Sequence, residues 1–156
     1  MSEPVEHRGE TPLQRADRNW DELLGELRVT QTGVAILFSL LLTVPFSARF
    51  DSVDAFQRRV YLVALLLAAA SAVVLIAPVA YHRVLFAHRQ KQAVVRASNR
   101  FAVIGLALLC LALSAVLLLV ADVLLQRAAA AAVAGVFGVA TAGLWFVPGM
   151  LRRRTR

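Results

Sequence analysis

The chain has 156 residues, of which 59% are hydrophobic, and its mean hydropathy is +0.67. This composition lies on the apolar side of soluble globular domains. The formal net charge is +7, from 17 Lys and Arg against 10 Asp and Glu. In a soluble protein that excess would favour nucleic acid as a partner, but here the basic residues flank long apolar runs. We therefore expect one membrane-embedded unit and no nucleic-acid binding.

The first 28 residues are polar and lack an early apolar run, so we expect no cleaved signal peptide. Residues 1–16 have two prolines, a glycine and little to bury, which predicts a disordered tail. Asp17 or Asn19 can cap the helix that follows. Its apolar residues recur on one helical face: Trp20, Leu23, Leu24 and Leu27. This pattern predicts an amphipathic N-terminal helix.

Four long apolar runs follow, at about 29–48, 60–80, 101–121 and 128–147. Each has about 20 residues, the length that a helix needs to cross a hydrocarbon core about 30 Å thick. The sequence therefore predicts an all-α fold, an integral membrane antiparallel four-helix bundle over 17–148. Pro148 and Gly149 should end the last helix, leaving a basic tail over 149–156.

The distribution of Lys and Arg predicts the orientation of the spans. If both termini are cytoplasmic, that side carries 13 of the 17 basic residues. This bias is typical of short cytoplasmic loops, so we expect both termini in the cytoplasm. The arginines at 152–156 should lie among anionic headgroups, where each charge contributes about 1 kcal/mol. The lipid bilayer and its anionic lipids are thus the predicted partners.

Span one carries hydroxyl side chains on one helical face: Thr32, Ser39, Thr43 and Ser47. Two interpretations remain open. Small hydroxyls can bond the carbonyl four residues back and let neighbouring backbones approach. Alternatively, the stripe lines an ion path or binds a ligand. Pro45, near the outer end of the span, can kink or end the helix, and the segment Asp51-Ser52-Val53-Asp54 is expected to cap the next helix.

Span four is rich in alanine and glycine, and its small residues form two interleaved rows. The rows are Ala131, Gly135 and Val139, and Ala134, Gly138 and Ala142. Small residues promote close helix contact in membranes. We therefore expect a homo-oligomer that self-associates through span one or span four.

Residues 81–100 connect spans two and three, and apolar residues recur among their basic ones. We expect both spans to continue as helices into the cytoplasm and to meet at a turn near 88–92. The acids of the amphipathic helix should dock on the bases of this hairpin. The residues involved are Asp21, Glu22 and Glu26 on the helix, and Arg83, Arg89, Lys91, Arg96 and Arg100 on the hairpin.

Signals for catalysis are missing from the sequence. His82 and His88 are six residues apart and do not share a helical face, and no carboxylate pair or cysteine joins them at metal spacing. There is no P-loop, nucleophile elbow or dinucleotide fingerprint. Cys110 lies within span three, where a small apolar packing role is expected. We predict a protein that is not an enzyme, with no cofactor and no metal site.

The hypothesis that the protein transports ions depends on Asp122. Ion-coupled transporters usually place an ionisable side chain near the bilayer midplane, and none of the four apolar cores contains one. Asp122 follows the outer end of span three. It is either an interfacial acid paired with Arg127, or a proton or cation acceptor reached from outside. We expect a non-enzymatic structural or accessory protein; the alternative is a small ion channel or cation/proton transporter that uses Asp122 with the hydroxyl stripe.

Two segments, DELLGELRVTQTGVAILFSLLLTVPFSARF and IAPVAYHRVLFAHR, resemble a family of small four-helix bacterial membrane proteins of unknown function. The resemblance covers about residues 18–125. It rests on Glu-Leu-Arg-Val at the start of span one, Pro-Phe at its end and Ala-Pro-Val-Ala-Tyr-His-Arg after span two. Members are often labelled sodium:proton antiporters. The resemblance implies the same four-span topology and a location in the bacterial plasma membrane.

Overall fold

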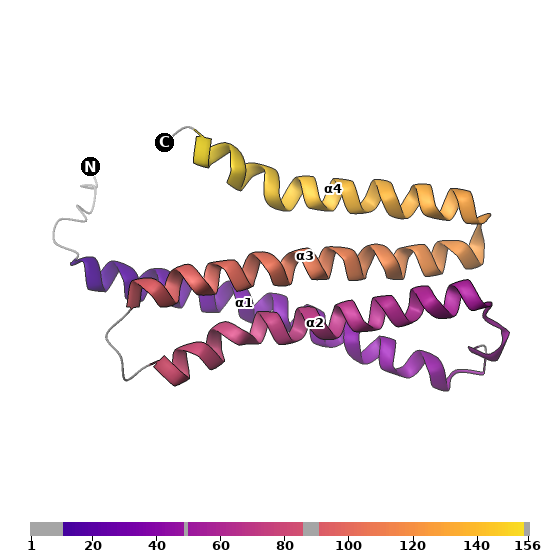
Figure 1. Ribbon diagram of the computed structural model, residues 1–156, viewed down its shortest axis with the longest axis horizontal. Helices are drawn as coiled ribbons and strands as arrows, with labels where there is room; N and C mark the ends of the chain where they lie inside the picture. The colour runs from indigo at the N-terminus through magenta and orange to yellow at the C-terminus, as the bar shows by residue number, and fades with distance from the viewer. Residues whose placement is uncertain (1–10, 49, 86–90, 155–156) are drawn as a thin grey trace, which may run out of the picture.

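The computed structural model describes residues 11–48, 50–85 and 91–154. Its long helices are α1 (Pro12–Thr43), α2 (Ala55–Leu85), α3 (Lys91–Leu124) and α4 (Arg127–Arg154) (Figure 1). Two short 3-10 helices, η1 (Val44–Phe46) and η2 (Phe50–Ser52), lie between α1 and α2. No strand occurs in these ranges, and the predicted all-α fold is confirmed.

Each long helix contains a segment long and apolar enough to cross a membrane. These segments are Gly25–Phe46, Ala55–Ala80, Ser98–Leu124 and Arg127–Val147, and they overlap the four predicted spans. Large apolar side chains such as Val73 and Val136 are about 70% exposed on their outer faces. An apolar surface of this extent would be costly in water and is expected against lipid. The four helices indicate a membrane protein.

α1 begins earlier than the sequence predicted. The Gln14 backbone N–H donates to the Thr11 hydroxyl at 3.2 Å, and the Thr11 N–H donates to the Gln14 side-chain oxygen at 2.8 Å. Pro12 occupies the first helical position, where its missing N–H costs no hydrogen bond. The predicted start at Asp17 or Asn19 is therefore too late, because this capping box already satisfies the end of the helix. Residues 1–10 of the predicted tail lie outside the described residues.

α4 extends further than predicted. The sequence placed its end at Pro148 and Gly149, but the helix continues to Arg154. A proline inside a helix removes one backbone hydrogen bond and can bend the helix without ending it. Most of the predicted basic tail is therefore the last turns of α4. α2 likewise continues through Pro78 to Leu85.

Prolines and side-chain donors lie together at the end of α1 and inside α2. Pro45 cannot donate to the Leu41 carbonyl, so α1 gives way to η1, and the Tyr61 hydroxyl of α2 donates to that carbonyl at 2.8 Å. In the turn before Pro78, the Gln31 side-chain amide of α1 donates to the Leu75 carbonyl at 2.8 Å. Side chains from neighbouring helices thus bond backbone carbonyls near both prolines.

α1, α2 and α3 pack around two clusters of buried residues. The first contains Leu27, Val34, Leu75 and Leu109, and the second contains Leu41, Tyr61, Ala68 and Ala112. Gly105 lets α3 approach α2 closely, because a Cβ there would lie 2.6 Å from the Leu75 side chain. The Ser71 hydroxyl donates across the same contact to the Gly105 carbonyl at 2.8 Å. These three helices form the core of the molecule.

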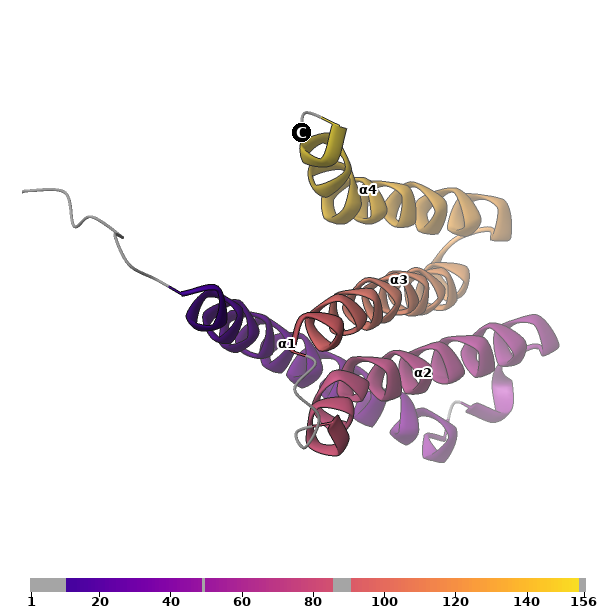
Figure 2. The same ribbon diagram turned by 60° about the vertical axis from the view of Figure 1, so that its left-hand side comes forward.

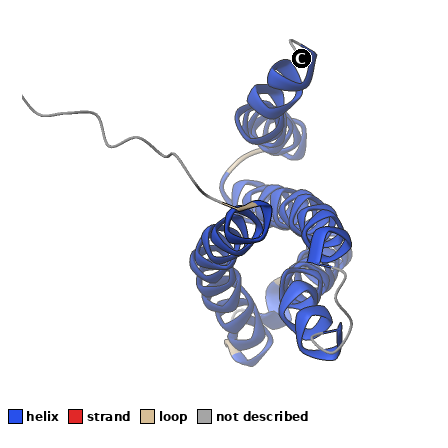
Figure 3. Ribbon diagram, turned by 90° about the vertical axis from the view of Figure 1, so that its left-hand side faces the viewer, coloured by secondary structure: helices blue, strands red, loops and turns tan. Residues whose placement is uncertain are grey.

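α4 lies apart from that core (Figures 2 and 3). In the described ranges its backbone approaches only that of α3. Ala130 and Ala134 are buried there, and the Cys110 thiol lies 3.7 Å from the Gly138 carbonyl, which accepts its hydrogen bond. The four predicted helices are therefore arranged as a three-helix unit with α4 along one side, not as a closed four-helix bundle.

Candidate functional site

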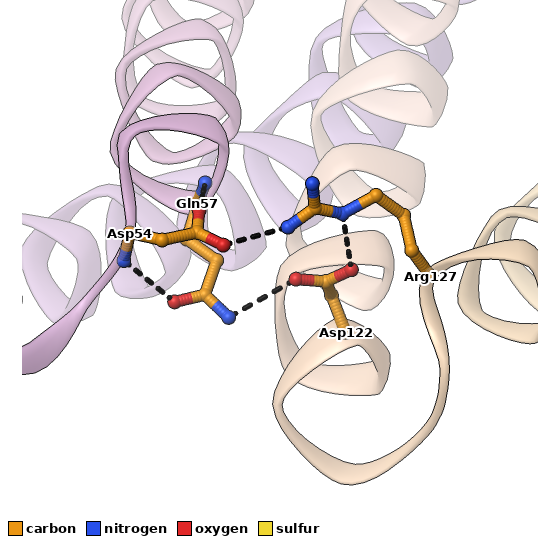
Figure 4. Close-up of polar contacts among 4 residues, drawn as sticks. All are labelled: Asp54, Gln57, Asp122 and Arg127. Carbon is orange, nitrogen blue, oxygen red and sulfur yellow. Dashed lines mark hydrogen bonds and ion pairs between the residues drawn. The ribbon is translucent and has the colours of Figure 1, made fainter.

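Four polar side chains meet where α2 begins, α3 ends and α4 begins. They are Asp54, Gln57, Asp122 and Arg127, which we call the Asp122 cluster (Figure 4). They come from three parts of the chain that the fold brings to one end of the molecule.

Asp54 and Gln57 form a reciprocal cap at the start of α2. The Gln57 N–H donates to Asp54 Oδ1 at 2.8 Å, and the Asp54 N–H donates to Gln57 Oε1 at 3.1 Å. This exchange fixes the Gln57 side-chain amide with its NH₂ group directed at Asp122 (Figure 4). That group donates to Asp122 Oδ2 at 3.0 Å and so joins α2 to the end of α3.

Arg127, the first residue of α4, joins both carboxylates. Its Nη2 lies 2.6 Å from Asp54 Oδ2, and its Nε lies 3.2 Å from Asp122 Oδ1. The guanidinium carbon also lies 4.2 Å from the centroid of the Phe56 ring, a cation–π contact. One side chain of α4 is thus held by groups at the start of α2 and at the end of α3.

The two carboxylates have different surroundings. The Asp122 side chain is 4% exposed, whereas those of Asp54 and Arg127 are 51% and 54% exposed. The hydrogen bond from the Gln57 backbone N–H is the largest effect on the pKa of Asp54 and lowers it; desolvation opposes this shift, and the Arg127 guanidinium adds to it. Asp122 is a buried acid with each oxygen bonded to a donor. The Asp122 cluster is therefore a network of ion pairs and hydrogen bonds in which both carboxylates are paired.

The pairing of Asp122 with Arg127 is the structural alternative that the sequence offered for this acid. The other members of the proposed ion path lie elsewhere. Thr32 and Thr43 donate to the backbone carbonyls of Arg28 and Leu40 at 3.0 and 2.7 Å, and Ser47 donates to Val44 at 2.7 Å. All are exposed, as is Ser39. No hydrogen bond joins these hydroxyls to Asp122 in the part of the chain that the structure describes.

The hydroxyl stripe also faces away from the core. The buried residues of α1 are Leu27, Val34 and Leu41, which recur every seven residues on one face. At 3.6 residues per turn, Thr32 and Ser39 lie on the opposite face of the helix. Within the described ranges the stripe is therefore exposed, and a helix packed on it would have to come from a second copy.

The predicted docking of the N-terminal acids on the hairpin stays a prediction. Glu22 lies 3.9 Å from Arg18 in its own helix, and Glu26 and Arg100 are exposed. The remaining side chains lie outside the described residues: Asp21, Arg83, Arg89, Lys91 and Arg96. No group of three His, Cys, Asp or Glu side chains that could hold a metal is found among the side chains that are described.

Sequence reasoning missed the role of Gln57. The segment Asp51–Asp54 was expected to cap α2, but the reciprocal cap is made by Asp54 with Gln57, three residues later, as a capping box requires. That local signal was present. Its second bond, to Asp122, spans 65 residues and depends on how α2 packs on α3.

The fold is that of a small all-α protein with four candidate membrane spans and the Asp122 cluster at one end. The chain belongs to a family of unknown function, DUF6328, whose model matches residues 9–148. The match includes all four candidate spans and the whole cluster, and it supports the predicted resemblance to a family without a known function. No significant match to a curated protein or a solved structure was found.

Proposed function

We propose that this chain is an antiparallel, four-span protein of the bacterial plasma membrane with a structural or accessory role rather than a catalytic one. The length and hydropathy of the four spans support membrane embedding. The excess of Lys and Arg at the ends where α1 begins and α4 finishes supports cytoplasmic termini. α2 and α3 extend beyond their candidate spans, to Leu85 and from Lys91, and would project into the cytoplasm.

The role includes self-association through α4. The observation that carries this proposal is the isolation of α4, whose backbone approaches only α3 in the described ranges. One flank of the helix carries the exposed small-residue row of Ala131 and Gly135. A Cβ at Gly135 would meet no atom within 4 Å. Such a flank lets a second helix approach closely.

The opposite flank of α4 carries more large side chains. Its exposed residues include Val133, Val136, Phe137 and Leu144 beside Ala129 and Ala140, whereas the row of Ala131 and Gly135 continues to the larger Val139. Bulky, flexible apolar side chains suit contact with lipid tails, whereas small residues suit contact with a helix. This asymmetry supports a second copy on the Ala131–Gly135 flank and lipid on the other.

Energy transfer between labelled copies in liposomes tests this proposal. Replacing Ala131→Leu together with Gly135→Leu should weaken association by about tenfold, or about 1.4 kcal/mol, because the added side chains hold the helices apart. The control pair, Ala129→Leu with Ala140→Leu, adds the same side chains to the opposite flank and should leave transfer unchanged. Equal losses in both pairs, or a monomeric parent protein at every lipid ratio, would contradict self-association through this flank.

The channel or transporter alternative has weaker support. Both oxygens of Asp122 are bonded to donors, and the hydroxyls of Thr32, Thr43 and Ser47 donate to backbone carbonyls three or four residues earlier. Flux of cations or protons into proteoliposomes tests it. Flux that Asp122→Asn abolishes would favour transport, and a well-folded but silent preparation would favour the structural role.

A further inference from the structure

An open hollow lies at the end of the molecule where α1 turns into α2. Its volume is about 610 Å³. It is lined by Pro45, Phe50, Val53, Ala55, Arg58, Arg59, Tyr61 and Leu62. Two of these residues are cationic, none is anionic, and the rest are apolar or aromatic. The hollow thus combines an apolar wall with two positive charges.

The α2 side of the hollow is one continuous helical face. Ala55, Arg58, Arg59 and Leu62 have the spacing i, i+3, i+4 and i+7, and all four are exposed. Neither Asp54 nor Gln57 lines the hollow, and both are engaged in the Asp122 cluster. The hollow is therefore a separate site from that cluster.

The loop side of the hollow is held in place by aromatic contacts. The Phe50 and Tyr61 rings meet edge to face, with centroids 5.4 Å apart, and the Tyr61 hydroxyl is fixed on the Leu41 carbonyl. The guanidinium carbon of Arg58 lies 5.7 Å from the Phe50 ring centroid. This contact uses the face of the ring and leaves the N–H donors of Arg58 uncommitted.

Arg58 and Arg59 differ from Arg127 in the partners of their guanidinium groups. Arg127 is bonded to two carboxylates, whereas neither Arg58 nor Arg59 makes a hydrogen bond or ion pair through its side chain with any residue in the described ranges. Both lie in the first turns of the candidate span Ala55–Ala80. At that depth a guanidinium lies at the boundary between headgroups and hydrocarbon.

We propose that this hollow binds a phospholipid with an anionic headgroup. Arginine matches phosphate oxygens with paired N–H donors, and two adjacent arginines supply a double contact. Val53, Ala55 and Leu62 then line the path of the glycerol and the upper acyl chain. The proposal goes beyond the structural role inferred above, because it assigns a ligand class to a site outside α4.

Lipid retention measured by native mass spectrometry tests the proposal. The delipidated full chain is titrated with phosphatidylglycerol and with phosphatidylcholine of the same acyl chains. We expect preferential binding of phosphatidylglycerol, and Arg58→Gln with Arg59→Gln should weaken it by about tenfold or more. The control Arg28→Gln with Arg100→Gln removes two exposed arginines elsewhere and should leave the preference intact.

A second arm separates a lipid site from a site for a free anion. Leu62→Trp fills the apolar part and keeps both arginines, so it should reduce phosphatidylglycerol binding while the thermal unfolding temperature stays unchanged. Inorganic phosphate at millimolar concentration should not displace the lipid. The proposal is overturned if both lipids bind equally, if the control pair lowers binding as much as the Arg58 and Arg59 pair, or if phosphate displaces the lipid. Arg59→Gln alone repeats the charge test if the double variant does not fold.

Discussion

The exposed carboxylate of Asp54 is stabilised in its ionised form by its hydrogen bonds. Its oxygens accept from the Gln57 backbone N–H and from Arg127, and these bonds lower its pKa below the ordinary value of 3.8. A lowered pKa in the folded state means that ionised Asp54 stabilises the fold above pH 3.8. That contribution is lost as the pH falls through the lower, folded-state pKa.

The pH dependence of unfolding tests whether ionised Asp54 stabilises the fold. We expect Asp54→Asn to be less stable than the parent near neutral pH, and the difference should shrink as the pH falls below 3.8, where the parent also loses its charge. Unfolding in detergent, followed by circular dichroism from about pH 2 to about pH 7, measures both curves. Asp51→Asn, an exposed acid in η2, is the matched control. A difference that stays constant across this range would contradict the role given to the Asp54 charge.

Asp122 and Arg127 form one ion pair, but their side chains differ in burial. Removal of Arg127 leaves a carboxylate with a 4% exposed side chain without its counterion, whereas removal of Asp122 leaves a half-exposed guanidinium that can be hydrated. An unpaired buried charge costs about 3–5 kcal/mol, and an exposed pair contributes about 1 kcal/mol or less. Loss of Arg127 should therefore destabilise the fold more than loss of Asp122, because Asp122 is the buried member of the pair.

We therefore expect Arg127→Ala to lower the free energy of unfolding more than Asp122→Ala does, by about 2 kcal/mol. Chemical unfolding in mixed micelles provides the comparison, with Arg28→Ala as the control for loss of one exposed arginine. An equal or reversed order would show that Asp122 is not held as a buried ion. The double variant should be more stable than Arg127→Ala alone, because it removes the orphaned charge as well.

At the scale of the element, the end of α1 receives a donor from another helix. Pro45 cannot supply a backbone N–H to the Leu41 carbonyl four residues earlier, and that oxygen accepts instead from the Val44 N–H and from the buried Tyr61 hydroxyl. A buried hydrogen bond of this kind contributes about 1 kcal/mol. The proline and the tyrosine are therefore coupled, although they lie on opposite sides of the connection between α1 and α2.

A double-mutant cycle measures this coupling. Tyr61→Phe should lower the free energy of unfolding by about 1 kcal/mol in the parent chain. In a Pro45→Ala background the same change should cost less, because the substituted alanine has a backbone N–H that can bond to the Leu41 carbonyl. Identical costs in both backgrounds would mean that the hydroxyl does not compensate for the proline.

The elements also show what the sequence could and could not predict. The four spans followed from run length, because a bilayer core demands about 20 apolar residues. Pro45 was expected to kink or end its helix, and it ends α1. The start at Pro12 was missed because the Thr11 and Gln14 cap lies in a segment whose composition predicted disorder. The continuation of α4 past Pro148 was missed because a proline does not always end a helix.

At the scale of the whole molecule, the arrangement of the helices was harder to predict than their number. The small residues of α4 correctly indicated close packing, but one row, with Ala134 and Gly138, faces α3, while Ala131 and Gly135 are exposed. A sequence pattern states that a face can be packed, not which helix packs on it. The meeting of Asp54 and Gln57 with Asp122 likewise depends on packing between helices distant in the sequence.

The separation of α4 from the core has a consequence for the order in which the protein is made. Both buried clusters are built from α1, the following connection, α2 and α3, without a residue of α4. They can therefore be complete while the ribosome is still adding the final helix. Asp122 precedes Arg127 by five residues and can pair with it as soon as the turn between α3 and α4 forms, whereas Asp54 is made 73 residues earlier. The Asp122 cluster would then tie the start of the last helix to the three-helix core.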